Sequence, residues 1–125
     1  ATGPVGEFFL AGIWSLGQAE PSLLSERITA ILRRRKLTQP LGEPTCGSVF
    51  RNPPGDSAGR LIEAAGCKGV RVGKARVTAQ HANFIVNEGG CAADIESLMT
   101  RVRERVAKCF GVYLEPEVQV VGGEI

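Results

Sequence analysis

The stretch "SVFRNPPGDSAGRLIEAAG", residues 48–66, decides the fold class, because it places a strand, a turn and a helix in direct succession. "SVFR" has strand composition, and "NPPG" is typical of a turn. Asp56 is predicted to cap the helix, and Gly66 is predicted to end it. The apolar side of this helix would carry Ala58, Leu61, Ile62 and Ala65.

The residues downstream continue this alternation of strands and helices. "KGVRVGKARVT", residues 68–78, alternates valines with lysines and arginines, which predicts a strand region with a basic outer face. "ANFIVNEGG" predicts another strand and a turn, and apolar residues at helical spacing from Ile95 to Phe110 predict the longest helix, ended by Gly111. "EVQVV", residues 117–121, is predicted to be a closing strand. The order favours a two-layer α+β sandwich over a doubly wound parallel fold.

The residues upstream predict a strand followed by a helix. "EFFLAGIWSL", residues 7–16, has strand composition, and Pro21 suits the first turn of a helix. One helix face would carry Leu24, Ile28, Ile31 and Leu32, and the basic run 33–36 suits the negative end of the helix. "LTQPLGEPTCG" is predicted to be a loop. Because the first strand has no obvious sheet of its own, it is interpreted as the tail of an upstream domain.

Size and composition limit the possible classes of protein. The chain has 125 residues, of which 43% are hydrophobic and 22% charged, as in an ordinary globular domain. No apolar run approaches the roughly 18 residues of a membrane span, and no basic segment introduces a signal peptide, so the cytoplasm is the expected location. Four cysteines without a CxxC pair and a single histidine make a metal site unexpected.

Ser48 is the first candidate for chemistry. A nucleophilic serine needs a neighbouring base, and "TCGSVF" lacks the second glycine of a nucleophile elbow. The glycine-rich, hydroxyl-rich "GEPTCGS" favours an anion instead, with basic residues on either side. From the residues alone, Ser48 reads first as a turn or strand-end serine that bonds its own backbone. The net charge of +2 and the absence of interleaved aromatic residues do not favour nucleic acid.

Two other positions have both an ordinary and a functional interpretation. His81, in "QHANFIV", reads either as a histidine at a strand edge or as part of a site. Glu115 and Glu117 flank Pro116, but alternate residues of a strand point to opposite faces, so they do not form a carboxylate pair. From spacing alone, the residues indicate an anion-binding α+β domain and no particular reaction.

A resemblance to a known family is carried by "GSVFRNP", "HANFIVN" and "LEPEV". In these motifs and the residues between them, the chain resembles the UDP-N-acetylenolpyruvoylglucosamine reductase family, also called UDP-N-acetylmuramate dehydrogenase. The resemblance covers the C-terminal substrate-binding domain, residues 37–121. The stretch before it is similar to the end of the family's flavin-binding half. The expected division is therefore 1–36 for the tail of the FAD-binding domain and 37–125 for the substrate-binding domain.

The resemblance implies a reaction and two catalytic residues. In this family NADPH reduces FAD, which passes a hydride to the enolpyruvyl group of UDP-N-acetylglucosamine enolpyruvate, and the product enters peptidoglycan. Ser48 would then donate a proton to the carbon that becomes electron-rich, with Lys36 or a water molecule replacing the lost proton. Glu117 would lie by the substrate carboxyl and donate a hydrogen bond. The family's third catalytic residue, an arginine, belongs to the preceding domain.

The resemblance also implies binding residues and a partner. Lys36 and Asn52 would bind the diphosphate, with Arg33 or Arg35 as a supporting cation, and His81 would contact the nucleotide. Because the FAD-binding half is not part of these residues, the chain is expected to need its own N-terminal FAD domain or a complementing chain. The alternative is a non-catalytic module that binds a UDP-sugar or another anion. No nucleic acid, membrane or metal is expected.

Overall fold

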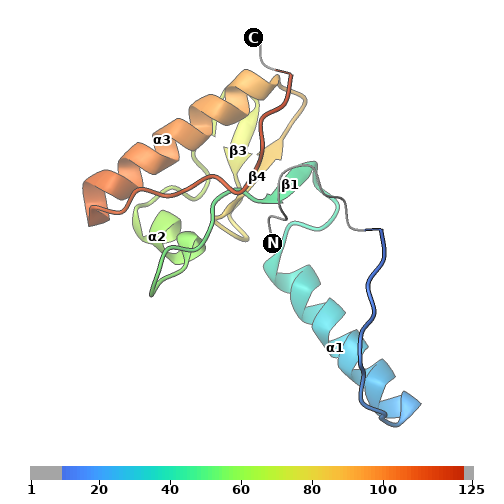
Figure 1. Ribbon diagram of the computed structural model, residues 1–125. Coiled ribbons are helices and arrows are strands. Elements are labelled where there is room, and N and C mark those ends of the chain that lie inside the picture. The colour runs from blue at the N-terminus through green and yellow to red at the C-terminus, as the bar shows by residue number, and fades with distance from the viewer. Residues whose placement is uncertain (1–9, 123–125) are drawn as a thin grey trace.

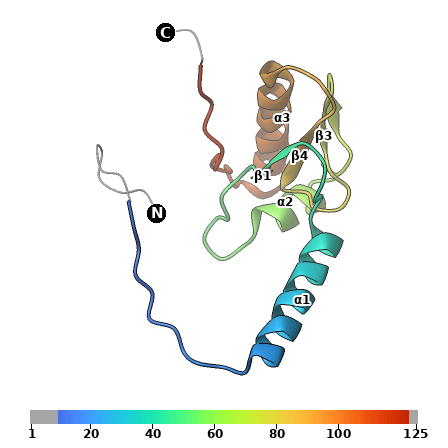
Figure 2. The ribbon, with the colours of Figure 1, turned by 90° about the vertical axis from the view of Figure 1, so that its right-hand side faces the viewer.

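The computed structural model describes residues 10–122 and has two layers, a sheet and a pair of helices, with a third helix projecting from them (Figures 1 and 2). The helices are α1 Pro21–Thr38, α2 Ala58–Ala64 and α3 Ala92–Phe110. The strands are β1 Thr45–Ser48, β2 Arg71–Val72, β3 Ala75–Val77 and β4 Phe84–Asn87. They form one antiparallel sheet in the order β1-β4-β3-β2. The predicted α+β fold class is confirmed.

Helix α3 covers the sheet and supplies much of the core. Its apolar residues recur at helical spacing, which places Leu98, Val102 and Val106 on one buried face. They pack in the same cluster as Ile62 of α2 and Val77 of β3. The helix ends at Gly111, whose φ of 68° is the left-handed conformation that glycine adopts without strain. At its start, the Cys91 side chain makes no capping hydrogen bond.

Helix α2 differs from the prediction at its first residue. The N-cap is Ser57, whose hydroxyl accepts a hydrogen bond from the Arg60 N–H at 3.3 Å. Asp56, the predicted cap, lies one residue too early and instead accepts hydrogen bonds from the Ser57 N–H and the Arg60 guanidinium. Both residues are of the capping type, so the pattern alone does not separate them. Gly66 follows the helix with a φ of 69°, as expected for its end.

The basic stretch 68–78 is a hairpin rather than one strand. Strands β2 and β3 pair directly across a turn at Gly73 and Lys74. The turn is fixed to α3, because the Lys74 N–H donates a hydrogen bond of 3.1 Å to the Asp94 carboxylate. Gly73 has a φ of 52°, and a Cβ built on it would overlap that carboxylate. Both the positive φ and the lack of space beside Asp94 therefore favour glycine at position 73.

We expect Gly73→Ala to destabilise the chain by about 1–2 kcal/mol more than Gly69→Ala. Both glycines have positive φ, so both substitutions carry the strain of a left-handed L-residue, about 1–2 kcal/mol. Only at Gly73 must the new methyl group displace Asp94 and its hydrogen bond, since a Cβ at Gly69 meets nothing within 4 Å. Urea denaturation of the two variants measures the difference. Equal losses would mean that Asp94 moves aside without cost.

Helix α1 begins at Pro21 as predicted and ends at Thr38, two residues beyond the expected division at 36/37. Basic residues occupy its last turn, as expected. None of its residues is buried, and the predicted apolar face is exposed, with Ile31 65% exposed. Among residues 10–122, no helix combines the length and the hydropathy that a bilayer crossing requires.

Two predicted strands do not form within the described residues. Residues 10–16 of the first are irregular and exposed, because no neighbouring strand accepts their hydrogen bonds; residues 7–9 lie outside the described range. The closing strand at 117–121 is replaced by an irregular segment. Its start is held by an isolated bridge between Phe50 and Pro116 and by a hydrogen bond from the Glu117 N–H to the Val49 oxygen, and Val118 packs against the core. The rest of the segment has no strand beside it among the described residues.

Candidate functional site

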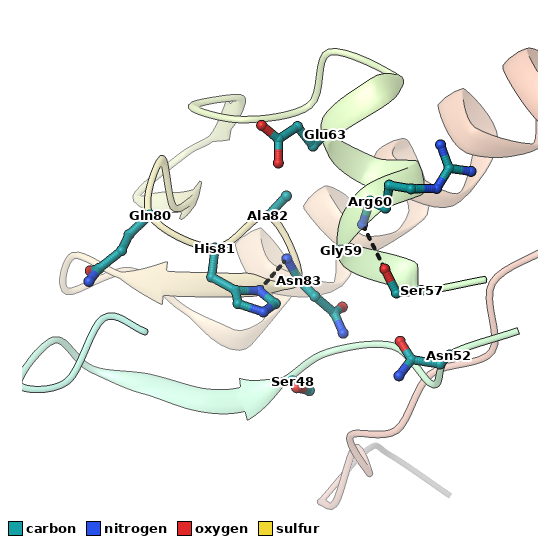
Figure 3. A pocket seen from close by; sticks show the side chains of 10 residues that line it. All are labelled: Ser48, Asn52, Ser57, Gly59, Arg60, Glu63, Gln80, His81, Ala82 and Asn83. Carbon is teal, nitrogen blue, oxygen red and sulfur yellow. Dashed lines mark hydrogen bonds between the residues drawn. The ribbon is translucent and has the colours of Figure 1, made fainter. Parts of the chain in front are cut away.

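A pocket of about 390 Å³ opens where the end of β1, the start of α2 and the loop before β4 meet (Figure 3). Three residues predicted from the sequence line it: Ser48, Asn52 and His81. They come from separate segments of the chain, and the fold brings them together in this pocket. The remaining lining is largely polar and is formed by Ser57, Gly59, Arg60, Glu63, Gln80, Ala82 and Asn83.

Ser48 is the last residue of β1 and is half-buried. The register of β1 against β4 is irregular between Thr45 and Ser48, and Gly47 between them has a φ of 85°. The strand ends at this irregularity, and its last residue, Ser48, lines the pocket. Among the side chains drawn in Figure 3, no hydrogen bond ends on the Ser48 hydroxyl, so it can bond a ligand.

Asn52 presents an oriented amide to the pocket. Its Oδ1 accepts a hydrogen bond of 3.0 Å from the N–H of Ala58, the first residue of α2. Since the oxygen is committed to the helix, the NH₂ group is left as a donor. An amide donor fixed in this way suits a phosphate or another oxyanion.

His81 is held by a tight turn before β4. Its Nδ1 accepts a hydrogen bond of 3.2 Å from the Asn83 N–H, and its ring packs edge-on against Phe84 at a centroid distance of 4.8 Å. In the neutral imidazole, the proton therefore resides on Nε2, which becomes a donor. A Cβ on Gly59 would lie 3.2 Å from the imidazole Cε1, so the lack of a side chain there lets α2 approach the ring closely.

Charge at the pocket is balanced by local ion pairs. Arg60 binds the Asp56 carboxylate, and this contact, with the Ser57 N–H, lowers the pKa of Asp56 from 3.8 to about 2. Glu63 pairs with Lys68 at 2.6 Å. The charges of Arg60 and Glu63, which line the pocket, are thus balanced by Asp56 and Lys68. The other polar groups of the lining are hydroxyl, amide and imidazole groups.

We expect Arg60→Gln to raise the pKa of Asp56 from about 2 toward 3.8, because it removes the main hydrogen bond to the carboxylate. A folded pKa below the unfolded value means that Asp56 stabilises the fold above about pH 4 and loses this contribution as pH falls through 2. A carboxyl carbon NMR titration measures the shift. Lys68→Gln, which removes a cation paired elsewhere, should leave Asp56 unchanged. An ordinary pKa in the unmodified chain would contradict the ion pair.

The predicted basic residues lie outside this pocket. The pocket residue Gln80 donates hydrogen bonds from Nε2 to the main-chain oxygens of Lys36 and Leu37, at 3.0 and 2.9 Å, which connects the end of α1 to the rim. Arg35 bonds the Gln39 side chain, and Arg33 lies on the surface of α1 itself. The structure thus brings the main chain of Lys36 near the site, and it does not bring in the guanidinium groups.

Glu117 is adjacent to the site through its main chain. Its N–H donates a hydrogen bond of 2.8 Å to the oxygen of Val49, the residue after Ser48. Its side chain is exposed and does not line the pocket. Ser48 and Glu117, the two predicted catalytic residues, therefore lie on neighbouring segments, but only Ser48 lines the pocket.

Sequence reasoning did not single out Arg60, Gln80 or Asn83 as lining residues. Arg60 is fixed by its contact with Asp56, which a spacing of four residues on a helix could have suggested. Asn83 lies within the HANFIVN motif that carried the resemblance and Gln80 directly precedes it, so the signal was present there. Residues 10–122 contain no group of three side chains that could bind a metal. Chemically, the site can bind an oxyanion and donate protons from a hydroxyl or an imidazole.

Comparison with known proteins agrees with these motifs. The family model described as UDP-N-acetylenolpyruvoylglucosamine reductase, C-terminal domain, matches residues 39–121. The reductase of that name from Alkalilimnicola ehrlichii is 55% identical over 122 residues, which is 97% of this chain and 41% of that protein. The one from Methylococcus capsulatus is 57% identical over 121 residues, or 96% of this chain and 40% of that protein.

A solved structure supports the same relationship. The crystal structure of UDP-N-acetylenolpyruvylglucosamine reductase from Thermus caldophilus matches with a TM-score of 0.70 and 40% identity, over 84% of this chain and 37% of that one. The chain thus spans about two fifths of the length of these relatives. It belongs to the family of the C-terminal domain of UDP-N-acetylenolpyruvoylglucosamine reductase.

Proposed function

We propose that this chain is the C-terminal, substrate-binding part of a flavoenzyme that reduces UDP-N-acetylglucosamine enolpyruvate to UDP-N-acetylmuramate for peptidoglycan synthesis. One observation carries the proposal: in a chain of this family, Ser48, Asn52 and His81 line one polar pocket. The enzyme would work in the cytoplasm. Residues 1–36 would be the tail of the FAD-binding part and 37–125 the substrate-binding domain.

The lining of the pocket offers hydroxyl, amide and imidazole groups, which suit a sugar nucleotide, and the family resemblance implies a flavin site outside this domain. We therefore assign the FAD to an N-terminal part, either preceding these residues or supplied by a complementing chain. When bound there and reduced by NADPH, FAD supplies the hydride that adds to the terminal vinyl carbon. The residues of this chain bind the substrate and provide the proton.

Ser48 is proposed as the proton donor. After hydride addition, negative charge develops on the carbon next to the substrate carboxylate, and the Ser48 O–H transfers its proton to that carbon. The serine oxygen then recovers a proton from water or from Lys36. A hydroxyl is a weak acid, but the carbanion is a strong base, so a positioned hydroxyl is sufficient. The half-buried end of β1 supports this role, because it presents the hydroxyl to the pocket.

Glu117 and the binding residues complete the proposal. Glu117, joined to Val49 by its main chain, would donate a hydrogen bond to the substrate carboxyl from the neighbouring segment. The NH₂ group of Asn52 would bind the diphosphate together with Lys36, whose helix end is connected to the pocket by Gln80. Arg33 or Arg35 would add a cation, and Nε2–H of His81 would contact the nucleotide.

Titration of this chain with UDP-N-acetylglucosamine, followed by NMR, tests the binding half of the proposal. We expect shifts at Ser48, Asn52 and His81, and we expect Asn52→Ala to weaken binding by about 10- to 100-fold, since a hydrogen bond to a charged group is worth about 1.5–3 kcal/mol. Asn87→Ala, at the far end of β4, is the matched control. Shifts confined to other surfaces, or equal weakening by both variants, would contradict the assignment of this pocket.

A further inference from the structure

The segment that carries Ser48 and Asn52 leaves the sheet just where it enters the pocket. Strand β1 ends at Ser48, opposite Phe84 of β4, and the chain then runs through Val49 and Phe50 to Asn52. Val49 and Phe50 are almost fully buried. Since a buried peptide group needs a partner, the main chain of this segment must find hydrogen bonds outside the sheet.

One side of the segment is held by the C-terminal residues. The Val49 oxygen accepts from the Glu117 N–H at 2.8 Å, and the Arg51 N–H donates to the Glu115 oxygen at 2.9 Å. Between them, Phe50 faces Pro116 in an isolated bridge. In such an antiparallel pair, the N–H and C=O of Phe50 point away from Pro116. The N–H and C=O of Phe50 therefore need partners on the side of the segment that faces away from Pro116.

Asn83 satisfies both groups on that side. Its Oδ1 accepts from the Phe50 N–H at 3.0 Å, and its Nδ2 donates to the Phe50 oxygen at 2.8 Å, across 33 residues of chain. The Val49 N–H also donates to the Asn83 main-chain oxygen at 2.9 Å. Asn83 is only 4% exposed. We call the two side-chain hydrogen bonds the Asn83 clamp.

We infer that Asn83 is a positioning residue for Ser48, because the clamp fixes the buried dipeptide from which the Ser48 hydroxyl is presented. This inference rests on the proposed function, in which Ser48 donates the proton. The oxygen and the nitrogen of the amide each bond Phe50, so Asn83 acts through the segment that follows β1. An aspartate would keep the acceptor and lose the donor, and an alanine would lose both.

The clamp itself is tested on this chain by amide hydrogen exchange. Asn83→Ala and Asn83→Asp should accelerate exchange of the Phe50 N–H by about 10-fold or more relative to amides in the middle of α3. Asn87→Ala is the matched control, because that asparagine also bonds main-chain groups, those of Gly89 and Gly90, but none in the Ser48 segment. Unchanged exchange at Phe50 in both Asn83 variants would overturn the inference.

The link to Ser48 is tested by a double-mutant cycle in a flavin-containing protein that includes this chain. Asn83→Ala should slow reoxidation of the flavin by substrate by about 10- to 100-fold, the cost of misplacing a reacting group by about 1 Å, with kcat more affected than KM. In a Ser48→Ala background it should add no more than about 2-fold. Asn83→Asp serves in the same cycle where the alanine variant does not fold.

The outcomes separate this inference from the proposed function. Equal losses from Asn83→Ala in both backgrounds would show a general structural role and overturn the positioning role. If Ser48→Ala alone leaves reoxidation at the native rate, the proposed proton donor is wrong, and the positioning role fails with it. If Asn83→Ala slows reoxidation only when Ser48 is present, the result supports both the proton donor and the positioning residue.

Discussion

Ser48→Ala should leave reduction of the flavin by NADPH near its native rate and slow reoxidation by UDP-N-acetylglucosamine enolpyruvate by about 100- to 10,000-fold, in a flavin-containing protein that includes this chain. The range is that of a positioned proton donor. Removing the hydroxyl leaves the pocket walls in place, because the Ser48 main chain remains in β1 and Phe50 remains bonded to Asn83. Stopped-flow absorbance of the flavin measures the two half-reactions separately.

Ser57→Ala is the matched control for this experiment. Ser57 also lines the pocket, but its hydroxyl is occupied as the N-cap of α2. It should cost stability of about 1 kcal/mol and leave reoxidation within a few-fold of native. If Ser48→Ala slows both half-reactions equally, or neither, Ser48 is not the proton donor.

The α+β architecture could be predicted because its long elements have unambiguous periodicity. For α3, the apolar residues, the basic end and the terminal glycine all agree, and the helix forms where expected. The alternation of valines and basic residues over 68–78 predicts one strand region, whereas the structure divides it into β2 and β3, paired across a turn. Local patterns thus define a helix of this length better than a hairpin.

The expected strands at 7–16 and 117–121 show what sequence cannot supply. Strand composition describes a side chain's preference, whereas a strand exists only when a neighbour accepts its hydrogen bonds. Residues 10–16 have no such neighbour within the described chain, and 118–121 run beside none. Partner availability is a property of the whole fold, and the strands that composition predicts are absent at 10–16 and 117–121 of the described residues.

The candidate site could be predicted only in part, because some of its contacts join residues far apart in the sequence. The resemblance identified Ser48, Asn52 and His81, which share the pocket. The role inferred for Asn83 depends on a contact across 33 residues, and no spacing within one element indicates that contact. The basic run 33–36 was predicted as a phosphate-binding feature, but its guanidinium groups lie on an exposed helix, and their role stays a prediction.

Leu98→Ala should lower the free energy of unfolding of this chain by about 2–5 kcal/mol, while Leu32→Ala should change it by no more than about 0.5 kcal/mol. Both leucines lie on apolar faces that helical periodicity predicts, and both substitutions remove the same atoms. They differ in surroundings: Leu98 is fully buried on α3 among the core residues, and Leu32 on α1 is 56% exposed.

The cost at Leu98 arises because the surrounding core cannot collapse into the space, whereas water already reaches Leu32. Urea denaturation monitored by far-ultraviolet circular dichroism measures both values on the same chain. A loss at Leu32 comparable to that at Leu98 would mean that the apolar face of α1 is covered in solution, and its exposure in the structure would then be wrong. A small loss at Leu98 would contradict the packing of α3 on the sheet, which holds the pocket in place.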